Sequence, residues 1–585
     1  MENTGTMRRF FPILEWLPRY QKSDFKGDLQ AGLTVTVMLI PQSMAYALLA
    51  GVPPIYGLYA SVVPLVVYAF LGTSKQLAVG PAAMISLLTA TGIAQLATIG
   101  SPDFVMYAVM LAFLVGVLQI LMGIFRVGFL VNFISHPVIK GFTFAASLII
   151  AVSQFKYILG LDIPRGHFIL TTLRDLYQHL PQTSLPTVVI GVGSILLLVA
   201  MKKWKPGFPA ALLVVVLSTV VVAVLRLDKA GVSIVGNIPA GLPAPHLPAL
   251  SSAVVRELIP TAVTIAFVGF MESISVAKAM AARHHYTIDA NQEMIAIGAA
   301  NVAGSLFQAY PVAGGFGRTA VNDQAGARTP LALVVTATGI LITLLFFTPF
   351  FYYLPRAVLA AIIIVAVWGL MDWKELKFLW AVKPSDAGLL LITFLATLLV
   401  GIEQGILIGI GASILAFIFQ STRPHYAILG QLPGTRFFRN VERFPQARTF
   451  PGIVILRIDA SFYFANANFL RERLEKLLYR PQPLRAVILD CGSVNSLDST
   501  ALESLSDIVR EFAENKVELL FANVKGPVRD VMRKSGLLAV IGPQRIFLSV
   551  ADAVDCVLDH TAFTTCQREH PYLDLEEQPR SKKYK

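Results

Sequence analysis

The chain has 585 residues, of which 55% are hydrophobic and 14% are charged, whereas a soluble domain carries about a quarter charged residues. This composition excludes an ordinary soluble protein, because long apolar runs also follow one another between residues 31 and 419 and burial in a bilayer explains them. The net charge of +12 does not indicate a nucleic-acid partner, since no module concentrates basic and aromatic residues on one face.

Residues 1–26 form a basic amino-terminal segment without the compact apolar core and cleavage site of a signal peptide, so we expect it to remain on the chain. Residues 27–425 predict an α-helical polytopic membrane domain with about fourteen spanning or half-spanning segments. The segments cover residues 31–49, 55–71, 78–97, 104–125, 138–158, 185–201, 209–225, 258–279, 294–309, 317–325, 331–350, 358–370, 387–400 and 405–419.

Basic residues in the predicted loops indicate the orientation, because cytoplasmic loops collect Lys and Arg. With the amino terminus inside, the alternate loops contain Lys75, Arg126, Lys202, Lys203, Lys205, Arg283, Arg328, Lys374, Lys377 and Arg423. The opposite loops have fewer basic residues, and aspartates partly offset them. An even number of crossings places both termini in the cytoplasm, and the protein in an inner or plasma membrane.

The carboxy-terminal part of the sequence has a different pattern, in which short β-branched runs alternate with helical ones. This alternation predicts a small cytoplasmic α/β domain over residues 451–562. Residues 426–450 are expected to link it to the membrane domain. The tail, residues 563–585, is polar, and we expect it to be disordered.

Glycine and proline interrupt two of the apolar segments, at residues 77–88 (LAVGPAAMISLL) and 309–322 (AYPVAGGFGRTAVN). A broken helix leaves backbone N–H groups that lipid cannot satisfy, so it persists where it lines a cavity or binds a ligand. The breaks lie in the third and tenth segments, at matching places in two halves of the domain. Such a pair indicates an inverted-repeat transporter with a site at the membrane midplane. Two helix N-termini that face one site favour an anion.

Arg318 follows Gly317 at the start of the second half-helix. Burying an unpaired guanidinium in hydrocarbon costs at least about 2.5–3.5 kcal/mol. Arg318 must therefore face a cavity, an anion or a carboxylate. Anion binding and a bracing salt bridge both remain open, and the two can alternate.

Glu272 lies deep in the eighth segment, where a carboxylate is expected to face away from lipid. A carboxylate beside an anion site can take up a proton or hold a sodium ion, which would couple ion movement to anion movement. The alternative is a fixed pairing with Arg318 or Lys278. Ser273 and Ser275 offer hydroxyl groups nearby, although helical hydroxyls commonly bond their own backbone.

Other kinds of site have little support in the sequence. The stretch GGFGRT lacks the Lys and the following hydroxyl residue of a phosphate-binding loop, which argues against an ATP-driven pump. His284 and His285 are adjacent and diverge on a helix, and no further ligand completes a metal set. We expect no enzyme activity, metal or cofactor, and only H⁺ or Na⁺ as a coupling ion.

Several stretches of the chain resemble the sulfate permease (SulP) family of anion transporters, the relatives of pendrin and prestin. The resemblance covers nearly the whole chain, and its most specific stretches are IPQSMAYALLAGVPPIYGLYAS (40–61), GTSKQLAVGPAAMISLL (72–88), ISHPVIKGFTFAA (134–146), NQEMIAIGAANVAGSLFQAYPVAGGFGRTAVN (291–322) and the carboxy-terminal domain. It implies seven plus seven inverted segments in core and gate domains. It also implies a cytoplasmic STAS domain and a homodimer.

In that family the first, third, eighth and tenth segments form the substrate pocket. Matched by motif, the resemblance assigns substrate-binding roles to Gln42, Tyr46, Pro81, Ala82, Ala83, Gly315, Phe316, Gly317, Arg318 and Thr319. Ala82 departs from relatives that carry a bulky residue after the Gly-Pro pair. A roomier pocket weakens any inference about which anion binds.

The STAS resemblance rests on the motif LDSTALESL at residues 497–505, between a strand and a helix. In related anti-sigma-factor antagonists a serine of this motif is phosphorylated, so Ser499 and Thr500 are candidate regulatory positions. Thr500 and Glu503 also match a helix capping box, which we prefer as the explanation. A cytosolic protein partner of this domain is possible on the same resemblance.

Together these observations predict a secondary active transporter of small anions, of the sulfate, bicarbonate or dicarboxylate class, that works by alternating access with proton coupling. Sodium coupling, anion exchange and channel-like conductance are alternatives. A nucleobase–cation symporter would share the broken helices, and a membrane sensor that signals through the STAS domain is a further alternative.

Overall fold

The structure of the chain is a computed structural model that describes residues 11–128, 135–163, 169–204, 209–239, 241–245, 251–371 and 373–559. The chain divides into two compact units, Met1–Ser413 and Ile414–Lys585, and each is described here by itself. The predicted disordered tail, residues 563–585, and the first ten residues lie outside the described residues.

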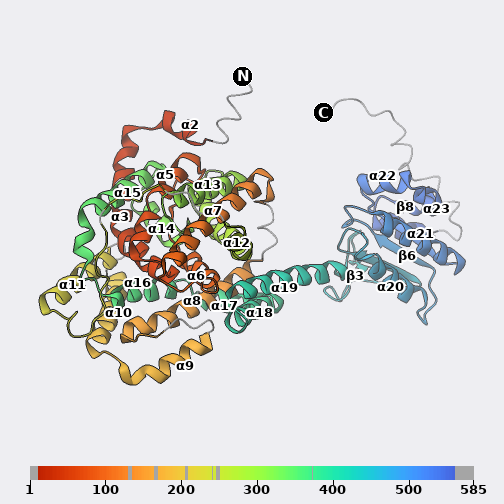
Figure 1. The fold of residues 1–585 in the computed structure, drawn as a ribbon. Helices are drawn as coiled ribbons and strands as arrows, with labels where there is room; N and C mark the ends of the chain where they lie inside the picture. Colours follow the sequence, from red (N-terminus) through yellow and green to blue (C-terminus); the bar gives the residue numbers. More distant parts are fainter. Residues whose placement is uncertain are drawn as a thin grey trace. The chain divides into compact units, whose positions relative to one another are not determined.

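The first unit is almost entirely helical (Figure 1). Its elements are α2 Ile13–Trp16, η1 Leu17–Arg19, α3 Lys22–Ala50, α4 Pro54–Tyr59, α5 Val63–Leu71, β1 Val79–Gly80, α6 Ala83–Ile93, α7 Pro102–Ile124, α8 His136–Leu159, α9 Ile169–His179, η3 Leu180–Gln182, α10 Leu185–Trp204, α11 Ala210–Leu225, α12 Ser252–Arg283, α13 Ala290–Ser305, β2 Ala313–Gly314, α14 Phe316–Gln324, α15 Leu331–Ile342, the π-helical turn η4 Thr343–Phe347, η5 Thr348–Phe351, α16 Arg356–Trp368, α17 Trp373–Val382, α18 Pro384–Leu399 and α19 Ile402–Thr422, which continues into the second unit.

Each of the fourteen predicted segments contains a helix of this unit. Within the described residues, nine helices are long and apolar enough to span a membrane. The other predicted segments correspond to the shorter helices α6, α11, α13, α14 and α18. The structure adds α9 and α17, which the sequence analysis left in loops because both mix apolar and polar residues over only 11 and 10 residues.

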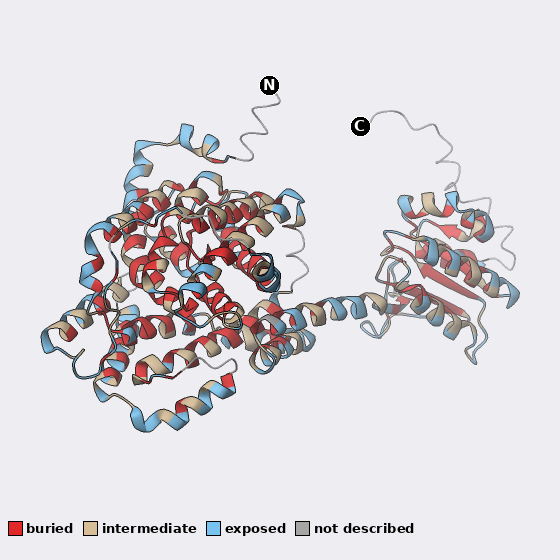
Figure 2. Cartoon of the chain, in the orientation of Figure 1, coloured by how far each residue is buried: buried red, intermediate tan, exposed pale blue. Residues whose placement is uncertain are grey.

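The two interrupted segments are joined through a short β-sheet. β1 pairs with β2 in antiparallel fashion, with Val79 opposite Gly314 and Gly80 opposite Ala313. The breaks therefore satisfy part of their freed backbone groups with each other, which is how non-helical backbone persists inside a membrane domain. Figure 1 shows α6 and α14, which follow these strands; α6 is buried along most of its length, whereas α14 also has exposed residues (Figure 2).

Small residues allow close helix packing beneath this sheet, as is common in membrane domains. Helices α7 and α13 cross at Gly116 and Gly298, where a Cβ built on Gly298 would lie 2.7 Å from the carbonyl oxygen of Gly116. No side chain fits this contact without moving one of the two backbones. The crossing therefore fixes the distance between the two helices.

We expect Gly298→Ala to destabilise the helical unit, because overpacking of a tight contact costs about 1–3 kcal/mol. The thermal unfolding midpoint in detergent should fall by several degrees. Gly193→Ala is the matched control, since a Cβ at Gly193 in α10 meets nothing within 4 Å. Equal midpoints for the two variants would show that the crossing has room to adjust.

The second unit is an α/β domain with a six-stranded sheet in the order β4-β3-β5-β6-β7-β8. Strands β5 to β8 are parallel, and β3 is antiparallel to both β4 and β5. Its elements are β3 Tyr426–Gln431, β4 Phe438–Asn440, β5 Ile453–Ile458, α20 Ala467–Leu478, β6 Ala486–Asp490, α21 Ser499–Glu514, β7 Glu518–Ala522, α22 Gly526–Lys534, α23 Leu537–Ile541, η6 Pro543–Arg545, β8 Ile546–Phe547 and α24 Val550–Asp559.

One apolar cluster of this unit unites residues of α20, α21, α22 and α23 with the sheet, and a second unites α24 with it. The helices therefore cover both faces of the sheet, as expected for parallel strands. The prediction of a linker at residues 426–450 is wrong, because this stretch contains β3 and β4, which extend the sheet. These strands are short and separated by turn residues, so the sequence alone resembled a connection.

Candidate functional site

The N-termini of α6 and α14 meet because the β1–β2 pair precedes both helices. Pro81 and Ala82 connect β1 to α6, and Gly315 connects β2 to α14. The sequence analysis predicted that the two breaks lie together, and the strand pairing confirms that proximity. The electropositive ends of two helices are thus placed at one point, which favours a negative charge there.

Arg318 joins the two breaks from within α14. Its side chain is 1% exposed. Nη1 donates a hydrogen bond to the carbonyl oxygen of Pro81, and Nη2 donates one of 3.2 Å to the carbonyl oxygen of Ala313. Nε is buried without a hydrogen-bond partner. In the described part of the chain Arg318 forms no salt bridge with a carboxylate, so backbone carbonyls replace the bracing acid that the sequence analysis considered.

Glu272 lies on α12 near this arginine without bonding to it. The carboxylate is half-buried, and its Oε2 atom has no hydrogen-bond partner. Glu272 and Arg318 attract each other electrostatically, but neither Arg318 nor Lys278 is within salt-bridge distance among the described residues. The fixed pairing that the sequence analysis considered for Glu272 is absent here, so the carboxylate retains a free acceptor atom.

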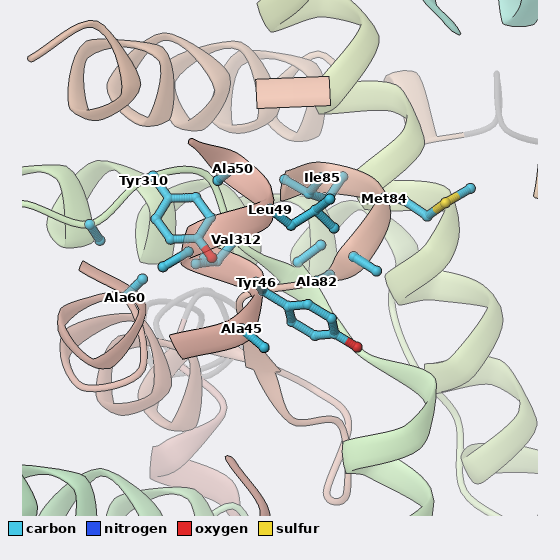
Figure 3. Close-up of a cluster of buried hydrophobic side chains, with 14 of the residues drawn as sticks. Ala45, Tyr46, Leu49, Ala50, Ala60, Ala82, Met84, Ile85, Tyr310 and Val312 are labelled. Carbon is cyan, nitrogen blue, oxygen red and sulfur yellow. The ribbon is translucent and has the colours of Figure 1, made fainter. Parts of the chain in front are cut away.

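Gln42 and Tyr46 approach the site from α3. The Gln42 amide Nε2 donates a hydrogen bond of 2.9 Å to the Tyr46 hydroxyl, whereas the amide oxygen Oε1 is buried and without a partner. Figure 3 shows Tyr46 in the same buried apolar cluster as Ala82 and Met84 of the third segment. α3 therefore contributes a buried, unpaired amide oxygen one helical turn from Tyr46.

The two serines of α12 have different surroundings. Ser273 is buried, and its hydroxyl accepts a 2.8 Å hydrogen bond from the N–H of Gly314 and donates one of 2.5 Å to the carbonyl oxygen of Gly269. Ser273 thus holds β2 against α12. Ser275 is exposed and donates to the carbonyl oxygen of Met271 at 2.7 Å. Their predicted role in ion coupling stays a prediction.

The start of α14 contains both buried residues that are held by contacts and residues that are exposed. The buried Thr319 hydroxyl accepts a 3.1 Å hydrogen bond from the N–H of Ala78, which ties α14 to the strand before α6. A Cβ on Gly315 would lie 2.8 Å from Nη2 of Arg318, so a larger residue there would displace the guanidinium group. Phe316 and Gly317 are exposed, whereas Ala83 is buried at the start of α6. The exposed pair shows that the helix start is accessible.

The sequence analysis missed Glu293, which the predicted boundary of the ninth segment had excluded. Its carboxylate is completely buried and accepts hydrogen bonds from Tyr68 Oη at 2.6 Å, from the Thr73 N–H at 2.5 Å and hydroxyl at 2.7 Å, and from the Ser74 N–H at 3.0 Å. It holds the loop that leads to β1. The sequence did contain a signal for this residue, namely a glutamate that directly precedes an apolar segment.

Asn301 in α13 was also missed, although a buried amide in an apolar segment suggests a structural polar contact. Its Oδ1 accepts a 2.8 Å hydrogen bond from the N–H of Val312, and its Nδ2 donates to the Val312 carbonyl oxygen at 3.1 Å. Nδ2 also lies 3.1 Å from Gln119 Oε1. Asn301 thus holds the backbone immediately before β2, as Glu293 holds the loop before β1.

A separate cavity of about 470 Å³ lies in the same unit. Leu87, Thr98, Ser153, Lys156 and Thr397 are among the residues that line it, and none of the predicted site residues does. It adjoins the end of α6 that is remote from the β1–β2 pair. Among the described residues, no group of three His, Cys, Asp or Glu side chains could hold a metal ion.

Ser499 and Thr500 lie in the second unit, at the start of α21, and both are exposed. The N-cap is Asp498, whose carboxylate accepts a 2.9 Å hydrogen bond from the N–H of Ala501. The predicted Thr500–Glu503 capping box is therefore wrong, because α21 begins at Ser499, two residues earlier than a Thr500 cap requires, and an aspartate occupies the cap position. The regulatory role of the two hydroxyls stays a prediction.

Comparison with known proteins gives matches to both units. The model of the Sulfate permease family matches residues 25–393, and that of the STAS domain matches residues 444–553. Sulfate transporter 4.1, chloroplastic, from Arabidopsis thaliana is 40% identical over 579 residues, which cover 96% of this chain and 84% of the relative. High affinity sulfate transporter 2 from Stylosanthes hamata is 35% identical over 570 residues, with 94% and 86% covered.

The chain has the same fold as a solved structure of the murine Solute Carrier 26 family member A9 (Slc26a9) anion transporter in the inward-facing state. The two proteins are 28% identical, the alignment covers 95% of each chain, and the TM-score is 0.87.

Proposed function

Because this chain belongs to the sulfate permease family and carries a STAS domain, we propose that it is a secondary active transporter of a small anion, with sulfate as the first candidate. The curated relatives described above are named as sulfate transporters, not as enzymes, and an anion transporter has the same fold. Bicarbonate and dicarboxylates are further candidates, since the small side chain of Ala82 leaves the pocket dimensions open.

One observation carries the proposal: α3, α12 and α14, the helices that carry the predicted site residues, each have a buried polar atom without a partner. Arg318 Nε, Glu272 Oε2 and Gln42 Oε1 are all buried and lack hydrogen bonds. Buried polar groups are normally paired, and each unpaired one costs about 1–3 kcal/mol. Such a cost is understandable where a ligand provides the missing partner. An anion there would accept a bond from the guanidinium and neutralise the two helix ends.

The way the site is built supports the proposal of alternating access. α6 and α14 each start at the site from one side, and α3 contributes Gln42 and Tyr46 from another helix. Rigid-body movement of the helices that carry the breaks, against the remaining helices, would expose the anion to one side of the membrane and then to the other. The exposed Phe316 and Gly317 agree with access from one side.

We propose that Glu272 couples proton movement to anion movement. Its free Oε2 atom lies near Arg318, so protonation of the carboxylate changes the charge that faces the guanidinium. A proton taken up together with the anion would then offset part of the anion charge during crossing. The same carboxylate would serve as a ligand if the coupling ion were sodium.

The direct test of function is uptake of radiolabelled sulfate, bicarbonate and dicarboxylates into proteoliposomes, at several pH values and with or without sodium. Saturable sulfate uptake that increases with an inward proton gradient is the expected result. Dependence on sodium, or on a counter-anion inside the vesicle, would instead indicate sodium coupling or exchange. Turnover too fast for alternating access would indicate a channel, and competition by uracil would indicate a nucleobase carrier.

Glu272→Gln is expected to abolish the dependence of uptake on the proton gradient, because the amide cannot take up a proton, while sulfate binding remains measurable. Glu257→Gln is the matched control, since Glu257 is an exposed glutamate on the same helix. It should keep the gradient dependence. If Glu272→Gln retains the wild-type pH profile, the coupling role is refuted.

A regulatory role of the STAS domain, a homodimer and a location in the cytoplasmic membrane with both termini inside are also part of the proposal. Absence of flux with retained partner binding by the STAS domain would favour a sensor. Phosphorylation of Ser499 or Thr500 would add charge at the N-terminus of α21, a position that accommodates negative charge.

A further inference from the structure

Four of the five tryptophans of the chain lie at or near the ends of three helices of the helical unit. They are Trp204 at the end of α10, Trp368 at the end of α16, and Trp373 and Trp380 in α17. All four are exposed, by 81%, 64%, 57% and 64%. Exposed tryptophans in a membrane protein mark the boundary between headgroups and acyl chains.

Lysines accompany these tryptophans. Lys202 and Lys203 precede Trp204, and Lys374 and Lys377 lie in α17, with all four exposed. A Cβ built on Gly369, which follows α16, would lie only 3.6 Å from Lys202 Nζ. The end of α10 therefore adjoins the end of α16, four residues before α17 begins. These eight residues are called the Trp–Lys cluster below.

α17 is oriented so that its polar and aromatic face is outward. Leu379 is buried against Ala387 and Leu390 of α18, whereas Lys377, Phe378 and Trp380 are exposed. Trp373 contacts Phe144 of α8 edge to face, with ring centroids 5.5 Å apart. This arrangement is that of a short amphipathic helix lying along the surface of a membrane.

Part of the positive charge of the cluster is uncompensated. Within the described part of the chain, Lys202, Lys203 and Lys377 form no ion pair, whereas the nearby Lys383 pairs with Asp386 at 3.3 Å. Lys202 lies beside the carbonyl end of α16, which stabilises one positive charge. Lys203 and Lys377 have no such partner. Clustered lysines next to a membrane attract anionic lipids, each by up to about fivefold in binding.

We propose that the Trp–Lys cluster binds the headgroup of an anionic phospholipid in the leaflet on this side of the membrane. The lysine ammonium groups would hold the phosphodiester, and the tryptophan rings would pack against the glycerol and upper acyl chains. α16 also packs against α3, which carries Gln42 and Tyr46. Lipid occupancy would thus stabilise a helix that supports the site. The proposal is independent of which anion is transported.

The tryptophan fluorescence of the full-length protein offers a direct test, because four of its five tryptophans lie in the cluster. The purified chain would be titrated in mixed micelles with brominated phosphatidylglycerol or brominated phosphatidylcholine, since bromine quenches nearby tryptophan. We expect the brominated phosphatidylglycerol to quench the fluorescence at a mole fraction several-fold lower than the brominated phosphatidylcholine requires. The triple variant Lys202→Gln, Lys203→Gln, Lys377→Gln should lose most or all of that several-fold preference.

The control is a triple variant with the same loss of charge at exposed lysines elsewhere, Lys229→Gln, Lys476→Gln, Lys516→Gln. It should retain the preference for the anionic lipid. Equal quenching by the two lipids, or an unchanged preference in the cluster variant, would overturn the proposal. Displacement of the anionic lipid by inorganic phosphate would also overturn it, because the site would then take free anions.

Discussion

Arg318→Gln is expected to abolish sulfate uptake, with a loss of at least about 100-fold, since charged hydrogen bonds to a bound anion contribute about 1.5–3 kcal/mol each. The substitution removes the only described guanidinium that joins the two breaks. It also leaves the helix N-termini without their central cation. Initial uptake rates in proteoliposomes, measured over a range of sulfate concentrations, give the loss directly.

A structural defect must be separated from this functional loss. Arg318 donates to the carbonyl oxygens of Pro81 and Ala313, so its removal also destabilises the β1–β2 region by about 1–3 kcal/mol for each unpaired group. Arg318→Lys keeps the charge and can retain one of these bonds, but it loses the planar guanidinium group that donates two hydrogen bonds at once. We expect the lysine variant to fold, to raise the KM for sulfate and to keep part of the maximal rate.

Sulfate-induced thermal stabilisation provides the second measurement. Wild-type protein should unfold at a higher temperature with sulfate present, and Arg318→Gln should show no such shift even where its own midpoint is preserved. A matched control is Arg328→Gln, since Arg328 is exposed after α14 and pairs with Asp24 at 3.2 Å. If Arg318→Gln keeps the sulfate-induced shift, the guanidinium does not contact the anion.

Glu293→Ala is expected to destabilise the helical unit by more than about 3 kcal/mol, the second large effect. The carboxylate accepts four hydrogen bonds in a completely buried position. Its removal leaves the donors of Thr73 and Ser74 without partners, and each orphaned buried donor costs about 1–3 kcal/mol. Thermal unfolding in detergent and the monodisperse fraction in gel filtration measure the effect.

Two further variants make this prediction specific. Glu293→Gln keeps a carbonyl oxygen for the Thr73 and Ser74 N–H groups, and the Tyr68 hydroxyl can accept from the amide, so we expect an intermediate loss of stability. Tyr68→Phe removes a single bond and should cost the least. The order Ala, Gln, Phe from the largest to the smallest loss is the expected outcome. A stable Glu293→Ala protein with impaired uptake would instead assign the carboxylate to transport.

The sequence alone determined which parts of this chain enter a membrane and where they are interrupted. Hydropathy sums over neighbouring residues, so each predicted segment corresponds to a helix. The Gly-Pro and Gly-Gly breaks were equally local signals, and they led to the pair of half-helices. Arg318 and Glu272 stood out because an ionisable residue in an apolar segment needs a polar environment.

The tertiary structure decided the partners of these groups. Arg318 bonds to Pro81 across 237 residues of sequence, and Glu293 holds Thr73 across 220. No periodicity in a segment encodes a contact over such distances. The same reason explains the two strands found in the predicted linker: β3 is a strand because it pairs with β5, a partner that lies beyond a turn and β4. Local chemistry fixed the elements, and only packing between remote segments fixed their pairing.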